Sequence, residues 1–201
     1  MANNSMPHKS SKNPLVMYSV NPQGVSFENQ ESGEKIILFL RAHFITLLPA
    51  ILQIIIIFIL PFFTVPILSL LRINFFDSLG GAQVFWIIVV WYLFFFGFSF
   101  YKFIFWYFNV YIVTNERIVD FDFRGILHKE TAYANLSQIQ DVTPKIIGFF
   151  GTYFHYGDVF IQTAAAKNEF DFHAVANPDD VARTILEEVR REEGESPGEI
   201  A

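Results

Sequence analysis

The sequence contains no cysteine among its 201 residues. This absence excludes disulfide bonds, cysteine-ligated zinc, iron–sulfur clusters and a thiol nucleophile. The chain also lacks the short motifs of zinc proteases, P-loop nucleotide-binding proteins, dinucleotide-binding folds and serine hydrolases. We therefore expect no enzymatic activity and no bound metal or cofactor.

Charged side chains are missing from two long stretches, residues 42–71 and 82–101. The second stretch has 20 residues and would form a helix about 30 Å long, which matches the hydrocarbon core of a bilayer. The first stretch is longer and includes Pro61 and Pro66, which disfavour one straight helix. We predict two transmembrane helices, at about 44–63 and 82–101, with a kink or break in the first near the two prolines.

The few basic residues around these stretches predict the orientation of the hairpin. Lys35 and Arg41 precede the first span, and Lys102 and Arg117 follow the second, whereas the loop between the spans contains only Arg72. Basic residues concentrate on the cytoplasmic side of membrane helices. We therefore expect a two-span protein of the cell membrane with both termini in the cytoplasm.

One polar side chain, that of Gln53, lies deep in the first span. An amide at this depth can hydrogen-bond across the hairpin or to a helix of another protein. The spans contain too few polar groups to line a pore by themselves.

The residues after the second span form an acidic segment. Residues 109–201 contain 8 basic and 16 acidic side chains, a net charge of −8. Such a segment is unsuited to nucleic acid and to attraction by anionic lipid through charge alone. We therefore expect no nucleic-acid partner.

After residue 109 the apolar pattern changes to alternation, which is typical of half-buried strands. In "ERIVDFDFR", for example, Val119, Phe121 and Phe123 alternate with charged residues. The segment "IIGFFGTYFHYG" is rich in glycine and aromatic residues and is expected to be a loop or bent connection. The other expected strands are "NVYIVT", "LHKETAYA", "LSQIQDVTP", "GDVFIQTA" and "NEFDFHAV".

The last predicted element is an amphipathic helix. Asn177 is suited to the N-cap and Pro178 to the first turn, and Val181, Ile185 and Val189 recur at helical spacing. A run of antiparallel strands closed by one helix is an α+β pattern.

These elements divide the chain into four parts. Residues 1–41 are expected to be a largely disordered cytoplasmic segment, and residues 42–108 to hold the two spans and their short loop. Residues 109–191 are expected to form the α+β domain, and residues 192–201 a disordered tail.

Several segments of this domain resemble a known family. In order, "YIVTNERIV", "RGIL", "IQDV", "FHYGDVFIQT" and "NPDDVARTI" are similar to the bacterial pleckstrin-homology-like (PH-like) domain family, with "VTNERI" the most specific element. The resemblance covers about residues 109–190. It implies seven strands in two near-orthogonal sheets, as an antiparallel sandwich or barrel, with a C-terminal capping helix.

Arg117 and Arg124 are the candidate ligand-binding residues, because they flank the second strand and are able to contact a phosphate. Asp120 and Asp122 lie on the same strand and favour a solvated face instead. His155, Asp158, Asp171 and His173 have side chains that can bind a metal, but their spacing does not support a site.

Two functions are compatible with this organisation. The first is a membrane-anchored binding or scaffold module that recognises a protein, peptide or lipid ligand at the cytoplasmic membrane surface. The alternative is an accessory subunit of a larger envelope or export and stress-resistance membrane complex. Besides the lipid bilayer, we expect a membrane or cytoplasmic protein partner, or a second copy of the chain.

Overall fold

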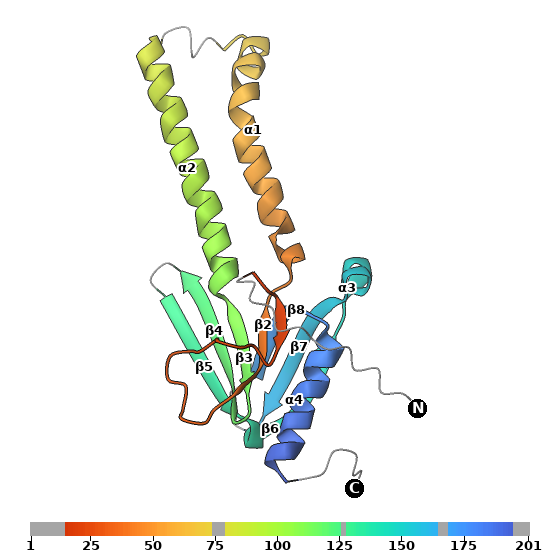
Figure 1. The fold of residues 1–201 in the computed structure, drawn as a ribbon. Coiled ribbons are helices and arrows are strands. Elements are labelled where there is room, and N and C mark those ends of the chain that lie inside the picture. The colour runs from red at the N-terminus through yellow and green to blue at the C-terminus, as the bar shows by residue number, and fades with distance from the viewer. Residues whose placement is uncertain (1–14, 74–78, 126–127, 165–168, 195–201) are drawn as a thin grey trace. The chain divides into compact units, whose positions relative to one another are not determined.

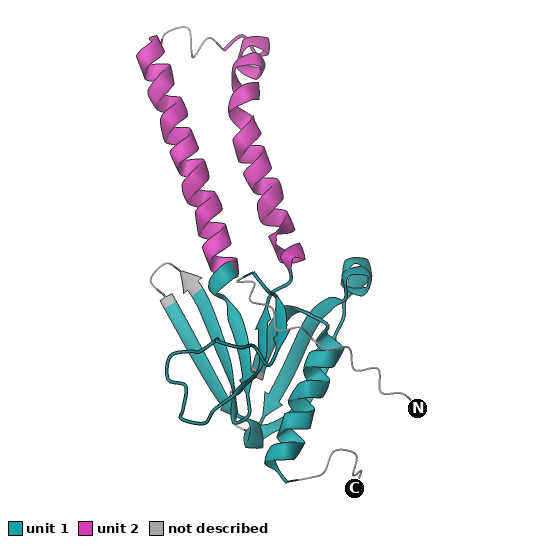
Figure 2. Ribbon diagram, in the orientation of Figure 1, with its two compact units in different colours: residues 1–43, 107–201 teal, residues 44–106 magenta. Residues whose placement is uncertain are grey.

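The computed structural model describes residues 15–73, 79–125, 128–164 and 169–194, which belong to two compact units (Figure 2). Unit 1 comprises residues 1–43 and 107–201, and unit 2 comprises residues 44–106. Part of the predicted loop between the spans and most of the predicted C-terminal tail lie outside the described residues.

Unit 2 is a pair of long helices (Figure 1). A short 3-10 helix, η1 (Phe44–Leu47), leads into α1 (Leu48–Leu70), and α2 (Gly81–Phe108) follows the connecting loop. The apolar stretch that starts at Phe44 has 27 residues and α2 has 28, so both are long and apolar enough to cross a membrane. They contain the two predicted spans and extend beyond them at one or both ends.

The expected break in the first helix does not occur, because α1 continues through Pro61 and Pro66 to Leu70. A proline has no N–H, so Pro61 cannot donate to the carbonyl of Ile57 one turn earlier. The indole Nε1 of Trp91 in α2 donates to this carbonyl instead, at 3.0 Å. The second helix thus supplies the hydrogen bond that the proline removes from the first.

Unit 1 contains two antiparallel sheets and two short helices (Figure 1), which makes it an α+β domain. The first sheet has five strands in the order β1-β2-β3-β4-β5, and the second has three in the order β6-β7-β8. Their bounds are β1 Tyr18–Val20, β2 Ile36–Arg41, β3 Val110–Thr114, β4 Arg117–Gly125, β5 His128–Asn135, β6 Ile139–Lys145, β7 Tyr156–Thr163 and β8 Glu169–Ala176. A 3-10 turn, η3 (Leu136–Gln138), joins the sheets, and the helices are α3 (Gly148–Phe154) and α4 (Pro178–Glu192).

The N-terminal segment differs from our expectation of disorder over residues 1–41. Residues 18–20 and 36–41 are strands, and the side chains of Leu38 and Leu40 are completely buried. The physical reason is that β2 hydrogen-bonds to β3 along its length and contributes to the same core. Residues 1–14 lie outside the described residues.

The hairpin is therefore an insertion between two neighbouring strands. Arg41, the last residue of β2, is paired with Val110, the first residue of β3. The segment from residue 42 to residue 109, which holds both long helices, leaves and re-enters the sheet at this pair. Among the described residues six strands follow residue 109, and β1 and β2 bring the total to eight, one more than the seven that the family resemblance implies.

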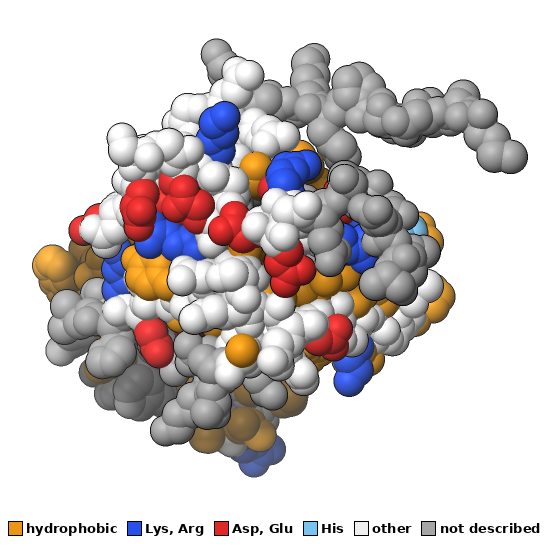
Figure 3. Space-filling view, turned by 90° about the horizontal axis from the view of Figure 1, so that it is seen from below, with side chains coloured by type: hydrophobic (Ala, Val, Ile, Leu, Met, Phe, Trp, Pro, Cys, Tyr) orange, Lys and Arg blue, Asp and Glu red, His pale blue; other side chains and the backbone are white. Residues whose placement is uncertain are grey.

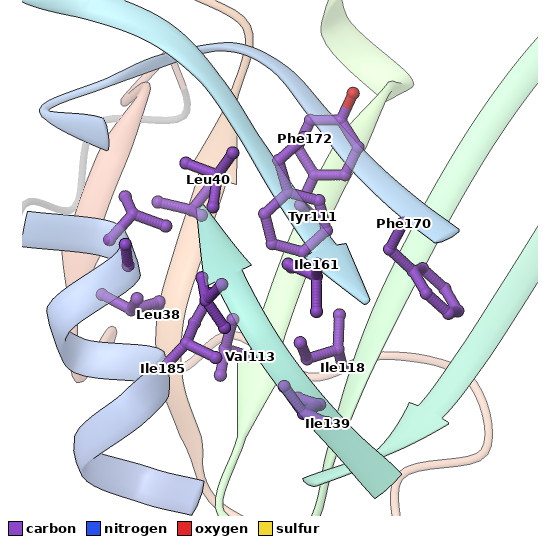
Figure 4. Close-up of a cluster of buried hydrophobic side chains, with 14 of the residues drawn as sticks. Leu38, Leu40, Tyr111, Val113, Ile118, Ile139, Ile161, Phe170, Phe172 and Ile185 are labelled. Carbon is purple, nitrogen blue, oxygen red and sulfur yellow. The ribbon is translucent and has the colours of Figure 1, made fainter. Parts of the chain in front are cut away.

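One buried cluster joins both sheets and α4 (Figure 4). Leu38 and Val113 from the first sheet, Phe172 and Ile161 from the second, and Ile185 from α4 belong to it. Burial of each such aliphatic side chain contributes roughly 1.5–3 kcal/mol. The prediction that α4 covers the core with its apolar face is confirmed, since Val181, Ile185 and Val189 are all buried.

Two details of strand and helix ends differ from the sequence prediction. Pro144 does not end its strand, because β6 continues to Lys145. Asn177 occupies the N-cap position of α4, but its side chain makes no capping hydrogen bond and its φ is 50°. Asparagine tolerates this left-handed conformation better than most residues, which explains its presence at the turn.

The Trp91 hydrogen bond gives a double-mutant test of helix pairing in unit 2. Trp91→Phe removes the donor and should destabilise the hairpin by about 0.6 kcal/mol, the average for interhelical hydrogen bonds in a membrane protein, and by at most about 1.7 kcal/mol. In a Pro61→Ala background the helix restores its own N–H donor, so Trp91→Phe should cost less. Reversible unfolding in mixed micelles measures both costs, and equal costs in the two backgrounds would contradict the pairing.

Candidate functional site

The turn between β3 and β4 binds the N-terminal segment. The amide oxygen of Asn115 accepts a hydrogen bond from the backbone N–H of Lys35 at 2.6 Å, and the Asn115 N–H donates to the Lys35 carbonyl at 3.1 Å. The buried hydroxyl of Thr114 donates to Oε1 of Glu34 at 2.8 Å. The "TNER" turn therefore fixes the residues that lead directly into β2.

Arg117 completes this arrangement through a bidentate ion pair. Its Nε and Nη2 atoms each lie 2.9 Å from a different carboxylate oxygen of Glu34, whose side chain is fully buried. Nη2 also donates to the carbonyl of Asn29 at 2.8 Å. The guanidinium lies between the rings of Phe27 and Tyr133, at 5.9 and 5.4 Å from their centroids. Two parallel N–H···O bonds of this kind are stronger and more specific than a single contact.

The pKa of the Glu34 carboxyl reflects opposing effects. Burial raises the pKa, but hydrogen bonds from Arg117, Thr114 and the Glu31 N–H stabilise the carboxylate and leave the pKa below its ordinary value of 4.5. The pair also raises the pKa of Arg117, first through the hydrogen bond to Glu34. Glu34 is therefore charged throughout the neutral range.

The same segment covers the outer face of the five-stranded sheet. The ring of Phe27 packs edge-to-face on Phe121 at 6.2 Å, over a small buried cluster that includes Ile112 and Val119. At the rim, Lys129 and Glu28 form an exposed ion pair at 2.9 Å. The Arg117 guanidinium is thus part of the contact between the N-terminal segment and the sheet.

Of the two predicted ligand-binding residues, Arg117 has a side chain that the structure describes and Arg124 does not. The described contacts of Arg117 are structural, since Glu34 and Asn29 take its hydrogen bonds. Arg124 lies in β4, and its side chain is outside the described residues. The proposed phosphate contact therefore stays a prediction for both residues, and at Arg117 a phosphate would compete with Glu34.

A second surface feature is the connection between β6 and β7, which we expected to be a loop. It contains the short helix α3, and its large apolar side chains point outward. We call the exposed set the aromatic platform: Ile146, Ile147, Phe149, Phe150, Tyr153 and Phe154. Phe149 is 77% exposed and Tyr153 is 68% exposed, although both are large and apolar.

Two glycines allow the segment of the aromatic platform to pack closely against the rest of unit 1. A Cβ at Gly151 would lie 3.1 Å from the carbonyl oxygen of Tyr156 and 3.2 Å from Cγ2 of Ile146, so this side of α3 packs closely on the strand ends. At Gly157 a Cβ would lie 2.4 Å from the Lys145 carbonyl oxygen, which no larger residue can accommodate. The close side of α3 thus favours glycine at position 151, and the aromatic rings occupy the open sides.

The rings of the platform are ordered in two rows. Phe149 stacks with Tyr153, and Phe150 stacks with Phe154, each pair four residues apart on the helix. At the base of the platform, His43 stacks on Tyr156 with 5.3 Å between ring centroids. Burial lowers the pKa of His43, so its ring is neutral at pH 7.

Figure 3 shows acidic and basic side chains interspersed over one face of the molecule. Among the described residues, no group of three His, Cys, Asp or Glu side chains is arranged to hold a metal ion. His173 and Asp158 lie 3.7 Å apart, and the carboxylate of Asp158 also accepts a hydrogen bond from the Ala174 N–H.

Sequence reasoning missed Glu34 and the aromatic platform. The sequence signal for the strand that follows Glu34 is the run of five apolar residues between Lys35 and Arg41. This run is too short for a span and has the length of a strand. The signal for the aromatic platform was the density of aromatic residues in "GFFGTYF", which is unusual for an exposed connection.

A comparison with models of protein families finds one that matches residues 42–189, and its description is "Bacterial PH domain". The match includes both long helices as well as the strands from β3 onward. No curated protein matches the chain. No solved structure matches it either.

The buried carboxylate gives a prediction about acid stability. Because the pKa of Glu34 is lower in the folded state than in the unfolded state, its stabilisation is complete above about pH 4.5 and is lost as the pH falls through the folded value. Glu34→Gln should lower stability at pH 7, by up to about 3–5 kcal/mol as when one partner of a buried pair is removed, and should weaken the acid dependence.

Thermal unfolding of the detergent-solubilised chain from pH 3 to pH 7 measures this effect. Glu116→Gln is the matched control, because Glu116 lies in the same turn with an exposed side chain. Equal behaviour of the two variants would show that the ion pair does not hold the N-terminal segment.

Proposed function

The chain belongs to the bacterial PH domain family, and from this premise we propose that it is a membrane-anchored binding module at the cytoplasmic surface of the cell membrane. PH-like domains in general serve as non-catalytic binding or scaffold modules. In this chain two long apolar helices would anchor the module. Its ligand would be a protein or peptide, or a lipid recognised by shape rather than by charge.

The observation that carries the proposal is the pairing of β2 with β3 across the hairpin. Arg41 and Val110 are opposite one another in the sheet, and every residue of the two helices lies between them in the chain. A segment that leaves and re-enters one strand pair must cross the bilayer an even number of times. Two crossings by α1 and α2 satisfy this requirement and keep the whole domain on one side.

The charge distribution supports the cytoplasmic side. Lys35 and Arg41 precede the hairpin and Lys102 lies near its end, whereas the loop contains Arg72. Trp106 and Tyr107 follow Lys102, and such aromatic residues concentrate at membrane–water interfaces. This combination favours an orientation with the loop on the far side of the membrane.

The charge of the domain supports a protein or peptide ligand over an anionic headgroup. Residues 109–201 have a net charge of −8. Basic residues near a membrane surface contribute about 1 kcal/mol each to binding of anionic lipid, and this domain has too few to offset its acidic residues. Arg117, the basic side chain with the most defined surroundings, is already paired with Glu34.

One observation favours the alternative of an accessory subunit in a larger membrane complex. The side chain of Gln53 is exposed on α1, within an otherwise apolar helix. A polar side chain at this depth is a typical contact between transmembrane helices of different proteins. Under this proposal a helix from a partner protein, or from a second copy of the chain, would cover Gln53.

Cysteine labelling tests the topology directly, because the protein has no cysteine of its own. Ser26→Cys and Glu187→Cys lie on exposed parts of unit 1, and Gly81→Cys lies at the start of α2 with nothing within 4 Å of the added Cβ. A membrane-impermeant maleimide should label Gly81→Cys in intact spheroplasts and label the other two only in inverted vesicles.

Labelling at the three positions distinguishes a wrong membrane topology from a reversed orientation. Labelling of Gly81→Cys and Glu187→Cys from the same side would refute the membrane hairpin. Labelling of Glu187→Cys and Ser26→Cys from the outside alone would retain the hairpin and reverse the orientation.

A further inference from the structure

We propose that the aromatic platform of α3 inserts into the interfacial layer of the bilayer and forms a third membrane contact beside the two long helices. This inference rests on the proposed function, because it requires that the helices anchor the chain in a membrane. It assigns the platform a lipid ligand and predicts that the domain is held at a fixed orientation to the membrane surface.

The exposure of the platform favours a contact with lipid. Phe149, Phe150 and Tyr153 are 77%, 57% and 68% exposed. Contiguous exposed apolar side chains of this kind mark contacts with proteins or membranes. Gly151 is the buried residue of α3, and a Cβ there would lie 3.1 Å from the Tyr156 carbonyl oxygen, so the side of α3 that faces the domain has no room for a large ring.

The position of the platform within unit 1 also favours this contact. Ala42, which follows β2, bridges to Val175, and the N–H of His43 donates to the carbonyl of Ala174 at 2.7 Å. The neighbouring Ala176 is paired with Tyr156, where β7 begins directly after α3. The platform and the end of β2 therefore lie at the same end of the domain.

This end is also where the chain passes into both long helices. His43 is the last residue of unit 1 before the apolar stretch that starts at Phe44, and its ring lies 5.3 Å from that of Tyr156 and 6.3 Å from that of Phe154. The return point, Val110, is paired with Arg41 at the same strand end. In a bilayer, the chain connections at His43 and Val110 would bring this end of the domain close to the headgroups.

The charge and the residue types of the segment around the platform are suited to a membrane interface. From residue 142 to residue 157 the chain has no acidic side chain, although residues 109–201 as a whole have a net charge of −8. The exposed Lys145 precedes the platform, and Tyr153 provides an amphipathic ring within it. Phenylalanine and isoleucine flanked by tyrosine and lysine are typical of segments that lie about 5–10 Å into the boundary between headgroups and acyl chains.

Site-specific fluorescence in proteoliposomes tests the inference with the full chain. Single cysteines at Tyr153→Cys, Glu187→Cys and Phe94→Cys are each labelled with an environment-sensitive fluorophore, in vesicles of neutral phosphatidylcholine. Quenching is then measured with spin-labelled lipid and with aqueous iodide. Phe94 lies within α2 and reports on the hairpin, and Glu187 lies on the exposed side of α4.

We expect the probe at position 153 to be quenched by spin-labelled lipid and protected from iodide, with a blue-shifted emission. The probe at position 187 should show the opposite behaviour. Because apolar contact drives the insertion, neither the lipid quenching nor the shift should change when salt is raised. Replacement of Phe149 and Phe150 by Asp should restore iodide quenching at position 153, and these exposed side chains should be replaceable without unfolding the domain.

The remaining outcomes separate this inference from the proposed function. If lipid quenches the probe at position 94 while the probe at position 153 behaves like that at 187, the hairpin is correct and the inference is wrong. If the probe at position 94 is not quenched by lipid, the membrane anchor itself is refuted. Protection of position 153 from both quenchers would show that protein covers the platform, and it would overturn the lipid assignment.

Discussion

The pairing of β2 with β3 is the constraint on which the rest of the structure depends. These strands are neighbours in the sheet, yet both long helices lie between them in the chain. Leu38 and Leu40 from β2 are completely buried in the cluster that also includes Val113 of β3 and Ile185 of α4. The domain therefore cannot complete its core until the chain beyond the hairpin has been synthesised. Closing so long a loop is entropically unfavourable, and the helices reduce this cost when they hold its ends together.

The "TNER" turn secures this arrangement at the other end of β2. Glu34 is buried and paired with Arg117, and Asn115 holds the backbone of Lys35. A buried carboxylate is tolerated because the bidentate pair and the Thr114 hydroxyl satisfy its oxygens. The family resemblance is strongest at this turn, and the structure gives the motif a physical role in binding the segment that precedes the membrane helices.

Much of unit 1 could be predicted from the sequence, because the strands from β3 to β8 and the helix α4 show the expected periodicities. Strand β2 was missed because apolar clusters cover both of its faces, and its only signal is the short continuous apolar run between Lys35 and Arg41. Leu38 faces the main core and Phe39 faces the cluster beneath Phe27, so the alternation that identifies a half-buried strand is absent. Helix α3 was missed because glycine and aromatic residues have low helix propensity, and because its buried residue is Gly151, which leaves no apolar periodicity in the sequence. The pairing of Arg117 with Glu34 could not be predicted, because Glu34 lies 83 residues away in the sequence.

Disulfide cross-linking in native membranes tests the β2–β3 pairing most directly, since the protein has no cysteine that would interfere. Phe39 and Ile112 are opposite one another in the two strands, so the Phe39→Cys/Ile112→Cys variant should form a disulfide under mild oxidation. Val119 is the partner of Ile112 on the next strand, two strand spacings or about 9–10 Å from Phe39, so Phe39→Cys/Val119→Cys should stay reduced. Failure of the first pair to cross-link, or equal cross-linking of both pairs, would contradict the insertion of the hairpin between two paired strands.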